Sequence, residues 1–132
     1  SADEYKAIVD LALQIDERIA EEDEKRDLIH VDGKKEFAFD EDRELMVVDS
    51  FGTADEDRWW DWTNYSKGEF VEMSKELVRQ YYREKGYYSM LTEARKQGKA
   101  EPKIPALPAS KIKEVSDLYV EMFELITGES YR

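Results

Sequence analysis

The chain contains 132 residues, with 20 basic and 32 acidic side chains and a formal net charge of −12. This length allows one domain, residues 1–132, with a modest hydrophobic core. An acidic surface repels nucleic acids and anionic membranes, so the composition argues against either as the main partner. The absence of cysteine excludes disulfides and thiolate metal sites. There is no apolar run of membrane-spanning length and no signal peptide ahead of the first predicted helix, so the expected location is cytoplasmic.

The first predicted element is an amphipathic helix that begins near Asp3. Apolar residues recur at intervals of three and four from Tyr5 to Ile19, which gives the helix one face for packing. The acidic side chains of Asp3 and Glu4 favour a helix N-terminus there. The charged run at residues 21–26 indicates a solvated helix end, with a partner-binding tail as the alternative.

A strand is predicted from residue 29 to residue 39, where apolar and polar side chains alternate. A period of two puts Asp32, Lys34 and Glu36 on one face of that strand. His30, the only histidine of the chain, falls on the same face, and its predicted role is structural.

An acidic segment at residues 40–43 separates this strand from a second alternating run, which predicts a hairpin. The predicted pairing places Phe39 opposite Glu44. It also places Lys34 opposite Asp49.

The predicted hairpin brings two carboxylates together. Opposed side chains of an antiparallel pair lie about 5 Å apart, and diagonal ones about 7 to 8 Å. Glu36 and Asp49 could therefore share one Mg²⁺ ion, with the Lys34 ammonium facing the same anionic ligand. A solvated strand face with surface salt bridges explains the same spacing, and the spacing alone favours that interpretation.

Three tryptophans follow Arg58 within four positions, and we expect them to anchor the loop at residues 49–57 rather than to stack on bases. Ser66 and Glu69 have the spacing of a capping box, which predicts a helix from there to Gly86. Lys75 and Arg79 would share one exposed face of this helix.

A short helix is predicted at residues 87–97, followed by a proline-containing connector at residues 99–108. The last predicted helix begins near Pro108 and ends at Gly128. Together these elements predict an α+β fold, in which an antiparallel hairpin or sheet packs against three main helices.

The order of these motifs resembles the C-terminal part of phosphoribosylaminoimidazole-succinocarboxamide synthases, the SAICAR synthase family. The resemblance extends over nearly the whole chain after residue 28. One departure is the segment Ala54-Asp55-Glu56-Asp57-Arg58, where the family usually has Pro-Asp-Ser-Ser-Arg. The matching segments are Asp32-x-Lys34-x-Glu36-Phe37, Asp49, Thr53-x-Asp55-x-x-Arg58, Lys75-Glu76-Leu77-Val78-Arg79 and the ending from Leu107-Pro108 to Thr127-Gly128.

The resemblance implies an ATP-dependent ligase of purine biosynthesis. In that reaction ATP phosphorylates the carboxylate of carboxyaminoimidazole ribonucleotide, and the amine of L-aspartate attacks the acyl phosphate to give SAICAR. Asp32 would orient Lys34. The other implied roles are catalysis by Lys34 and Asp49, binding of ATP and magnesium by Glu36 and Asp49, and substrate binding by Arg58, Lys75 and Arg79.

The resemblance also implies a nucleotide-binding N-terminal lobe in the same or a separate chain, and a homodimer as in some branches of the family. We expect the chain to be inactive without that lobe. The alternative hypothesis is a non-catalytic binding or regulatory module with the same fold. It rests on Glu56 and Asp57, whose carboxylates would compete with a substrate phosphate for Arg58.

Overall fold

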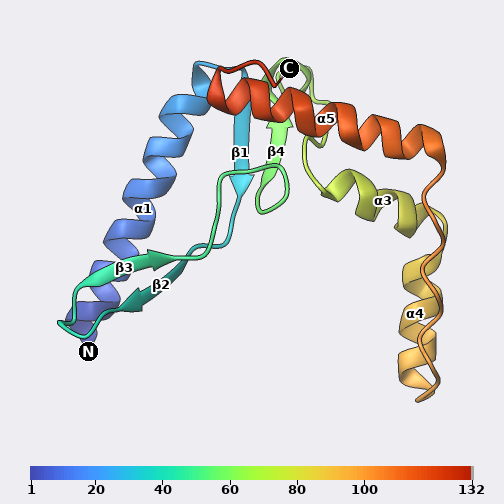
Figure 1. Cartoon of the computed structure of the whole chain (residues 1–132), viewed down its shortest axis with the longest axis horizontal. Coiled ribbons are helices and arrows are strands. Elements are labelled where there is room, and N and C mark those ends of the chain that lie inside the picture. The colour runs from blue at the N-terminus through green and yellow to red at the C-terminus, as the bar shows by residue number, and fades with distance from the viewer. Residues whose placement is uncertain (132) are drawn as a thin grey trace.

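The computed structural model describes residues 1–131 and combines helices with antiparallel strands, which confirms the predicted α+β class. In Figure 1 the strands β1 and β4 lie side by side near the centre, and α5 crosses one end of them. None of the helices among residues 1–131 is both long enough and apolar enough to cross a membrane. The elements in chain order are α1 (Ala2–Glu24), β1 (Leu28–Asp32), β2 (Glu36–Phe39), β3 (Leu45–Val48), β4 (Arg58–Asp61), α2 (Trp62–Tyr65), α3 (Glu76–Glu84), α4 (Tyr87–Lys96) and α5 (Ala109–Thr127).

The strands form two separate antiparallel pairs, β1 with β4 and β2 with β3. The prediction of one continuous strand over residues 29–39 is therefore wrong. The chain leaves the first pair at Gly33, where a Cβ atom would lie only 2.2 Å from Cγ of Asp57. Glycine is needed at this position because the backbone passes directly over a buried carboxylate.

An irregularity in β1 also separates two side chains that were expected to share a face. The pairing with β4 shifts by one residue between His30 and Asp32, as in a β-bulge. The side chain of His30 is 8% exposed. That of Asp32 is 56% exposed. The bulge thus turns the histidine into the core and the aspartate towards solvent.

The β2–β3 hairpin has a different register from the predicted one, since Phe39 pairs with Leu45 and not with Glu44. Its turn closes with a hydrogen bond of 3.1 Å from the Asp40 N–H to the Glu44 carbonyl. Arg43 adopts a left-handed φ of 65°, as is typical of three-residue hairpin loops. This turn shifts the pairing by one residue, so Lys34 and Asp49 are not directly opposed.

Ion pairs join the start and the tip of the hairpin to α1. The Lys35 ammonium is buried and lies 2.6 Å from the Asp16 carboxylate, and Arg43 pairs with Glu4. The hairpin therefore lies along the N-terminal part of α1, as Figure 1 shows.

The helix predicted from Ser66 to Gly86 is shorter than expected, because α3 begins only at Glu76. The preceding residues form a turn and then an extended segment in which Glu72 forms a bridge with Trp60 of β4. The Met73 N–H donates to the Trp59 carbonyl at 2.9 Å. Pairing with β4 thus overrides the capping pattern. The predicted helices at residues 87–97 and 109–127 are confirmed.

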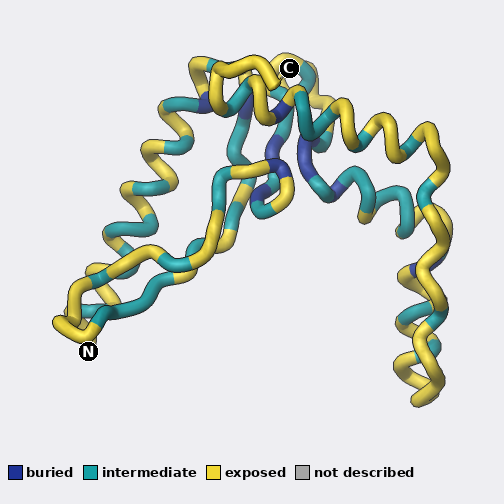
Figure 2. The backbone as a smooth tube through the Cα atoms, in the orientation of Figure 1, coloured by how far each residue is buried: buried dark blue, intermediate teal, exposed yellow. Residues whose placement is uncertain are grey.

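The buried core lies where β1 and β4 meet the C-terminal part of α5. Figure 2 shows the buried segments gathered there, whereas much of α1, the hairpin and α4 is exposed or only partly buried. Trp59 and Met122 are each 1% exposed, and they form the centre of the core. The buried apolar residues that pack together are Leu28, Ala54, Trp59, Met73 and Met122.

Asp23, near the end of α1, is only 5% exposed, and one of its carboxylate oxygens is buried without a hydrogen-bond partner. Burial raises the pKa of Asp23 to about 6, and the nearby charges of His30 and Arg26 offset this effect only in part. The folded protein therefore holds a proton on Asp23 at a pH where the unfolded chain has released it.

This difference predicts a loss of stability as the pH rises from about 4, where the unfolded carboxyl titrates, through the folded pKa of about 6. The loss is on the order of 2 to 3 kcal/mol. Asp23→Asn should remove that dependence and leave the protein more stable than wild type at pH 7.5. Urea unfolding followed by tryptophan fluorescence between pH 4 and 8 measures this. The exposed neighbour provides the control Glu24→Gln, and equal pH profiles for wild type and Asp23→Asn would contradict the prediction.

Candidate functional site

Lys34 lies between two carboxylates at the open end of the β2–β3 hairpin. Its ammonium is hydrogen-bonded to the Glu36 carboxylate and lies 3.7 Å from Oδ2 of Asp49. The hydrogen bond from Lys34 to Glu36, together with the charges of Glu36 and Asp49, raises the pKa of Lys34. All three side chains are substantially exposed, with exposed fractions of 72%, 47% and 50% for Lys34, Glu36 and Asp49. A ligand can therefore reach the group.

These three residues were predicted to meet, but the structure brings them together by a different route. Asp49 follows the last residue of β3 and has a left-handed φ of 74°. The chain therefore leaves the ladder at Asp49, whose side chain then faces Lys34 although the two are not paired across the hairpin. Oδ1 of Asp49 accepts a hydrogen bond of 2.9 Å from the Ser50 N–H, which fixes this conformation locally.

Arg58 at the start of β4 binds Asp32 at the end of β1 through two parallel hydrogen bonds. Nε of Arg58 donates to Oδ1 of Asp32 at 2.8 Å, and Nη2 donates to Oδ2. The arginine lowers the pKa of Asp32, and the aspartate raises that of Arg58. Asp32 thus holds Arg58, and the expectation that it orients Lys34 is wrong.

The two predicted site residues at α3, Lys75 and Arg79, have different surroundings. Arg79 donates from Nη1 to Oε2 of Glu76 at 3.2 Å, and Arg83 binds the other oxygen of that carboxylate. Burial alone would raise the pKa of Glu76, but the hydrogen bonds from Arg83 and Arg79 outweigh it and lower the pKa. Lys75 precedes the helix, and its N–H donates to the Ala54 carbonyl at 2.9 Å. Within residues 1–131 its ammonium forms no ion pair.

The predicted site residues thus form three groups, around Lys34, Arg58 and Glu76. Besides Asp32, the carboxylates of Glu72 and Glu76 raise the pKa of Arg58, so the start of α3 lies within electrostatic reach of Arg58. Two residues of extended chain span at most about 7 Å, which limits the distance between the backbones of Asp32 and Lys34. No direct contact between the Lys34 and Arg58 groups occurs in the part of the chain that the structure describes.

Glu56 and Asp57 bind other partners than Arg58, in contrast to the competition on which the hypothesis of a non-catalytic module rests. The Glu56 carboxylate accepts hydrogen bonds from Thr53 Oγ1 and, at 3.3 Å, from Ser50 Oγ. Asp57 is buried, and its Oδ2 lies 2.8 Å from Nε2 of His30. The sequence gives no signal for this pair, because no periodicity links two residues that lie 27 positions apart.

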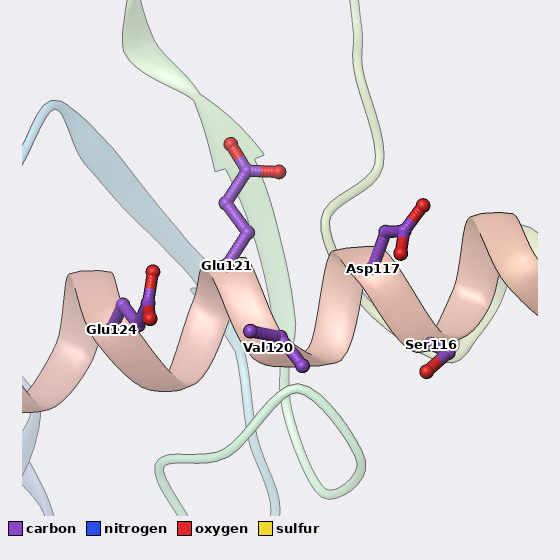
Figure 3. A pocket seen from close by; sticks show the side chains of 5 residues that line it. All are labelled: Ser116, Asp117, Val120, Glu121 and Glu124. Carbon is purple, nitrogen blue, oxygen red and sulfur yellow. The ribbon is translucent and has the colours of Figure 1, made fainter. Parts of the chain in front are cut away.

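A shallow acidic hollow lies on the outer face of α5, far along the chain from the predicted site residues. Figure 3 shows its side chains projecting from successive turns of this one helix. Among the described residues, no set of three or more histidine and acidic side chains is arranged to hold a metal ion. The hollow has a volume of about 380 Å³ and is lined by Ser116, Asp117, Val120, Glu121 and Glu124.

Comparison with known proteins identifies the family. The sequence model for SAICAR synthetase matches residues 1–94. The chain belongs to the SAICAR synthetase family. A phosphoribosylaminoimidazole-succinocarboxamide synthase of Thermoplasma acidophilum is 53% identical to it over 129 residues. A synthase of the same name from Thermoplasma volcanium is 54% identical over the same length.

Both matches to these synthases include 98% of this chain but only 44% of the relative, so the chain spans less than half the length of these synthases. Solved structures share the fold. A SAICAR synthase of Saccharomyces cerevisiae in complex with SAICAR superimposes with a TM-score of 0.70 at 22% identity, covering 96% of this chain and 39% of that one. A SAICAR synthetase in complex with ADP gives 0.66 at 23% identity, covering 100% of this chain and 41% of that one.

The exposure of the Arg58–Asp32 pair predicts that it contributes little to stability. An ion pair on the surface typically contributes up to about 1 kcal/mol, because water screens it. We expect Asp32→Asn, Arg58→Gln and the double variant each to change the free energy of unfolding by less than about 1 kcal/mol. Urea unfolding of the four proteins gives the coupling energy. A coupling well above that value would mean that the pair serves the fold rather than a ligand.

Proposed function

We propose that this chain is the C-terminal part of an ATP-dependent ligase of purine biosynthesis. The enzyme would join L-aspartate to carboxyaminoimidazole ribonucleotide and yield SAICAR, ADP and phosphate. The observation that carries the proposal is the convergence of Lys34, Glu36 and Asp49 in a member of the SAICAR synthetase family. Relatives named as synthases, and a related structure with SAICAR bound, support the same substrate class.

The carboxylates of Glu36 and Asp49 fit a Mg²⁺ ion bound together with a nucleotide. Both contact the same ammonium, so they already face one position of positive charge. Mg²⁺ in nucleotide sites commonly takes one or two carboxylates and completes its shell with phosphate oxygens and water. Two protein ligands are thus sufficient. When bound, the ion would neutralise negative charge on the phosphates.

Lys34 and Arg58 would hold the anionic groups of the reactants. The hydrogen bond to Glu36 raises the pKa of Lys34, so its ammonium keeps its proton. The ammonium can then face the substrate carboxylate that accepts the phosphoryl group. Asp32 occupies Nε and Nη2 of Arg58, and Nη1 has no other hydrogen-bond partner among residues 1–131. That nitrogen could donate to the ribonucleotide. The positively charged side chains of Lys75 and Arg79 would bind the same substrate.

The proposed reaction needs more than this chain. The longer relatives support a nucleotide-binding lobe supplied by the same polypeptide or by a second one, and without it we expect no turnover. A homodimer and a cytoplasmic location belong to the same proposal.

The first test is calorimetric titration of the chain with Mg²⁺ and ADP. We expect Glu36→Gln and Asp49→Asn each to weaken Mg²⁺-dependent binding by about tenfold or more, because each removes a charged ligand of the ion. The matched control is Glu44→Gln, which changes an exposed carboxylate elsewhere in the hairpin. Equal affinity of wild type and both variants would rule out the shared magnesium site.

A second test restores the missing part. The chain is mixed with the remaining portion of the Thermoplasma acidophilum relative, and SAICAR formation is followed by its absorbance. We expect activity from the mixture and none from the chain alone. Lys34→Met should lower the rate by about 100-fold or more, as loss of a preorganised charge does in other enzymes. Turnover by the isolated chain would refute the proposed need for a nucleotide-binding lobe. Full activity of Lys34→Met would refute the proposed role of the lysine.

A further inference from the structure

The buried carboxylate of Asp57 joins three segments that are distant in the sequence or lie on different elements. Oδ2 of Asp57 lies 2.8 Å from Nε2 of His30 in β1 and accepts a hydrogen bond of 3.0 Å from the Gly52 N–H. The same carboxyl group lies directly against Gly33, the joint between β1 and β2. The Asp57 side chain has no exposed surface, and that of His30 is 8% exposed.

Asp57 and two of the residues that it contacts, Gly33 and Gly52, lie close in the chain to residues of the candidate site. Asp57 immediately precedes Arg58, and Gly33 lies between Asp32 and Lys34. Gly52 lies in the β3–β4 loop, three residues after Asp49. A displacement of this one carboxylate would therefore move both the Lys34 group and the Arg58 group, which have no direct contact with each other.

The side chains of the site cannot fix their own positions. Lys34, Glu36 and Asp49 are about half exposed or more, and the ion pair of Arg58 with Asp32 is exposed as well. Exposed charged side chains have little packing to hold them, so their placement depends on the backbone from which they project. In this chain the backbone is held by the buried contact between His30 and Asp57.

We propose that His30 and Asp57 are positioning residues, which set the segment around Lys34 and the segment around Arg58 relative to each other. An N–H at Nε2 of His30 donates to the carboxylate, and the ring also packs on the buried Trp59 with a centroid distance of 4.9 Å. The donor is thereby fixed in direction. The inference rests on the proposed function, because it concerns the residues assigned to that site. The positions of the Lys34 and Arg58 segments can nevertheless be tested without any ligand.

The experiment compares three variants with wild type by two-dimensional NMR of the ¹⁵N-labelled chain. His30→Leu removes the donor, whereas His30→Gln restores an N–H near the position of Nε2. Glu56→Gln is the matched control, because it neutralises the partly exposed carboxylate next to Asp57, which does not contact His30. Slowly exchanging core amides and near-ultraviolet dichroism establish that each variant is folded at the temperature used.

We expect His30→Leu to shift the signals of the Arg58 Nε–H and of the Asp49 and Gly52 amides. His30→Gln should return them towards the wild-type positions, and Glu56→Gln should leave those of Arg58 and Asp49 in place. A purely structural role would lower the unfolding midpoint of His30→Leu but would leave these signals unchanged in the folded state. Unchanged signals of Arg58 and Asp49 in folded His30→Leu would overturn the proposal. Should His30→Leu fail to fold, Asp57→Asn takes its place with the same readout and the same deciding outcome.

A second arm measures the affinity for Mg²⁺ with ADP. We expect a tenfold or greater loss for His30→Leu and recovery for His30→Gln. Absence of binding by the wild-type chain would count against the proposed function alone, because the NMR arm decides the positioning role independently. Wild-type binding that persists undiminished in His30→Leu would overturn the proposal.

Discussion

The fold depends on the burial of one indole, that of Trp59. Its ring packs on His30, and its Nε1 donates to the Thr53 carbonyl at 3.1 Å. The backbone of the same residue pairs with β1 on one side and accepts the Met73 N–H on the other. Burying an aromatic side chain removes a large apolar area from water, which is the main favourable contribution in a chain with so few fully buried residues. β1, the loop before β4 and the segment before α3 are all fixed relative to this residue.

Around this apolar centre the chain separates charges that bind each other internally from charges left for a ligand. Asp57 is buried with His30, and the buried ammonium of Lys35 binds the half-exposed carboxylate of Asp16. Lys34, with its two carboxylates, and the Arg58 pair remain exposed. Buried pairs are costly to break because a single partner would remain without solvent, whereas exposed ones exchange partners readily. The exposed groups can therefore exchange partners without disturbing the fold.

The family relationship bears on this separation of buried and exposed charges. The chain matches a SAICAR synthetase model over residues 1–94 and shares its fold with solved synthases. Because the overall charge is acidic, any attraction of an anionic ligand would depend on local cations. From the sequence, the carboxylates of Glu56 and Asp57 were expected to compete with a phosphate for Arg58. In the structure both bind other partners. Among the carboxylates of Asp32, Glu56 and Asp57, only that of Asp32 binds the Arg58 guanidinium.

Local patterns in the sequence sufficed for the elements whose signals are short-range. The periodicity of α1 and α5, the helix before Gly98 and the hairpin after Phe39 were predicted from residues a few positions apart, because helices and tight turns form through local contacts. The association of Lys34, Glu36 and Asp49 was also predicted, although its geometry was not. The predicted site roles of these residues, and those of Arg58, Lys75 and Arg79, remain predictions.

Tertiary contacts decided the rest. The strand breaks at Gly33 because of Asp57, the bulge at Val31 turns His30 inwards, and the segment before Glu76 pairs with β4 instead of starting a helix. Each of these features depends on residues 11 or more positions apart, which no local periodicity records. The partner of Arg58 was likewise undecided by the sequence, since Asp32, Glu56 and Asp57 all carry the same charge. Only the folded chain shows which of these carboxylates is buried, which is bound elsewhere and which reaches the guanidinium.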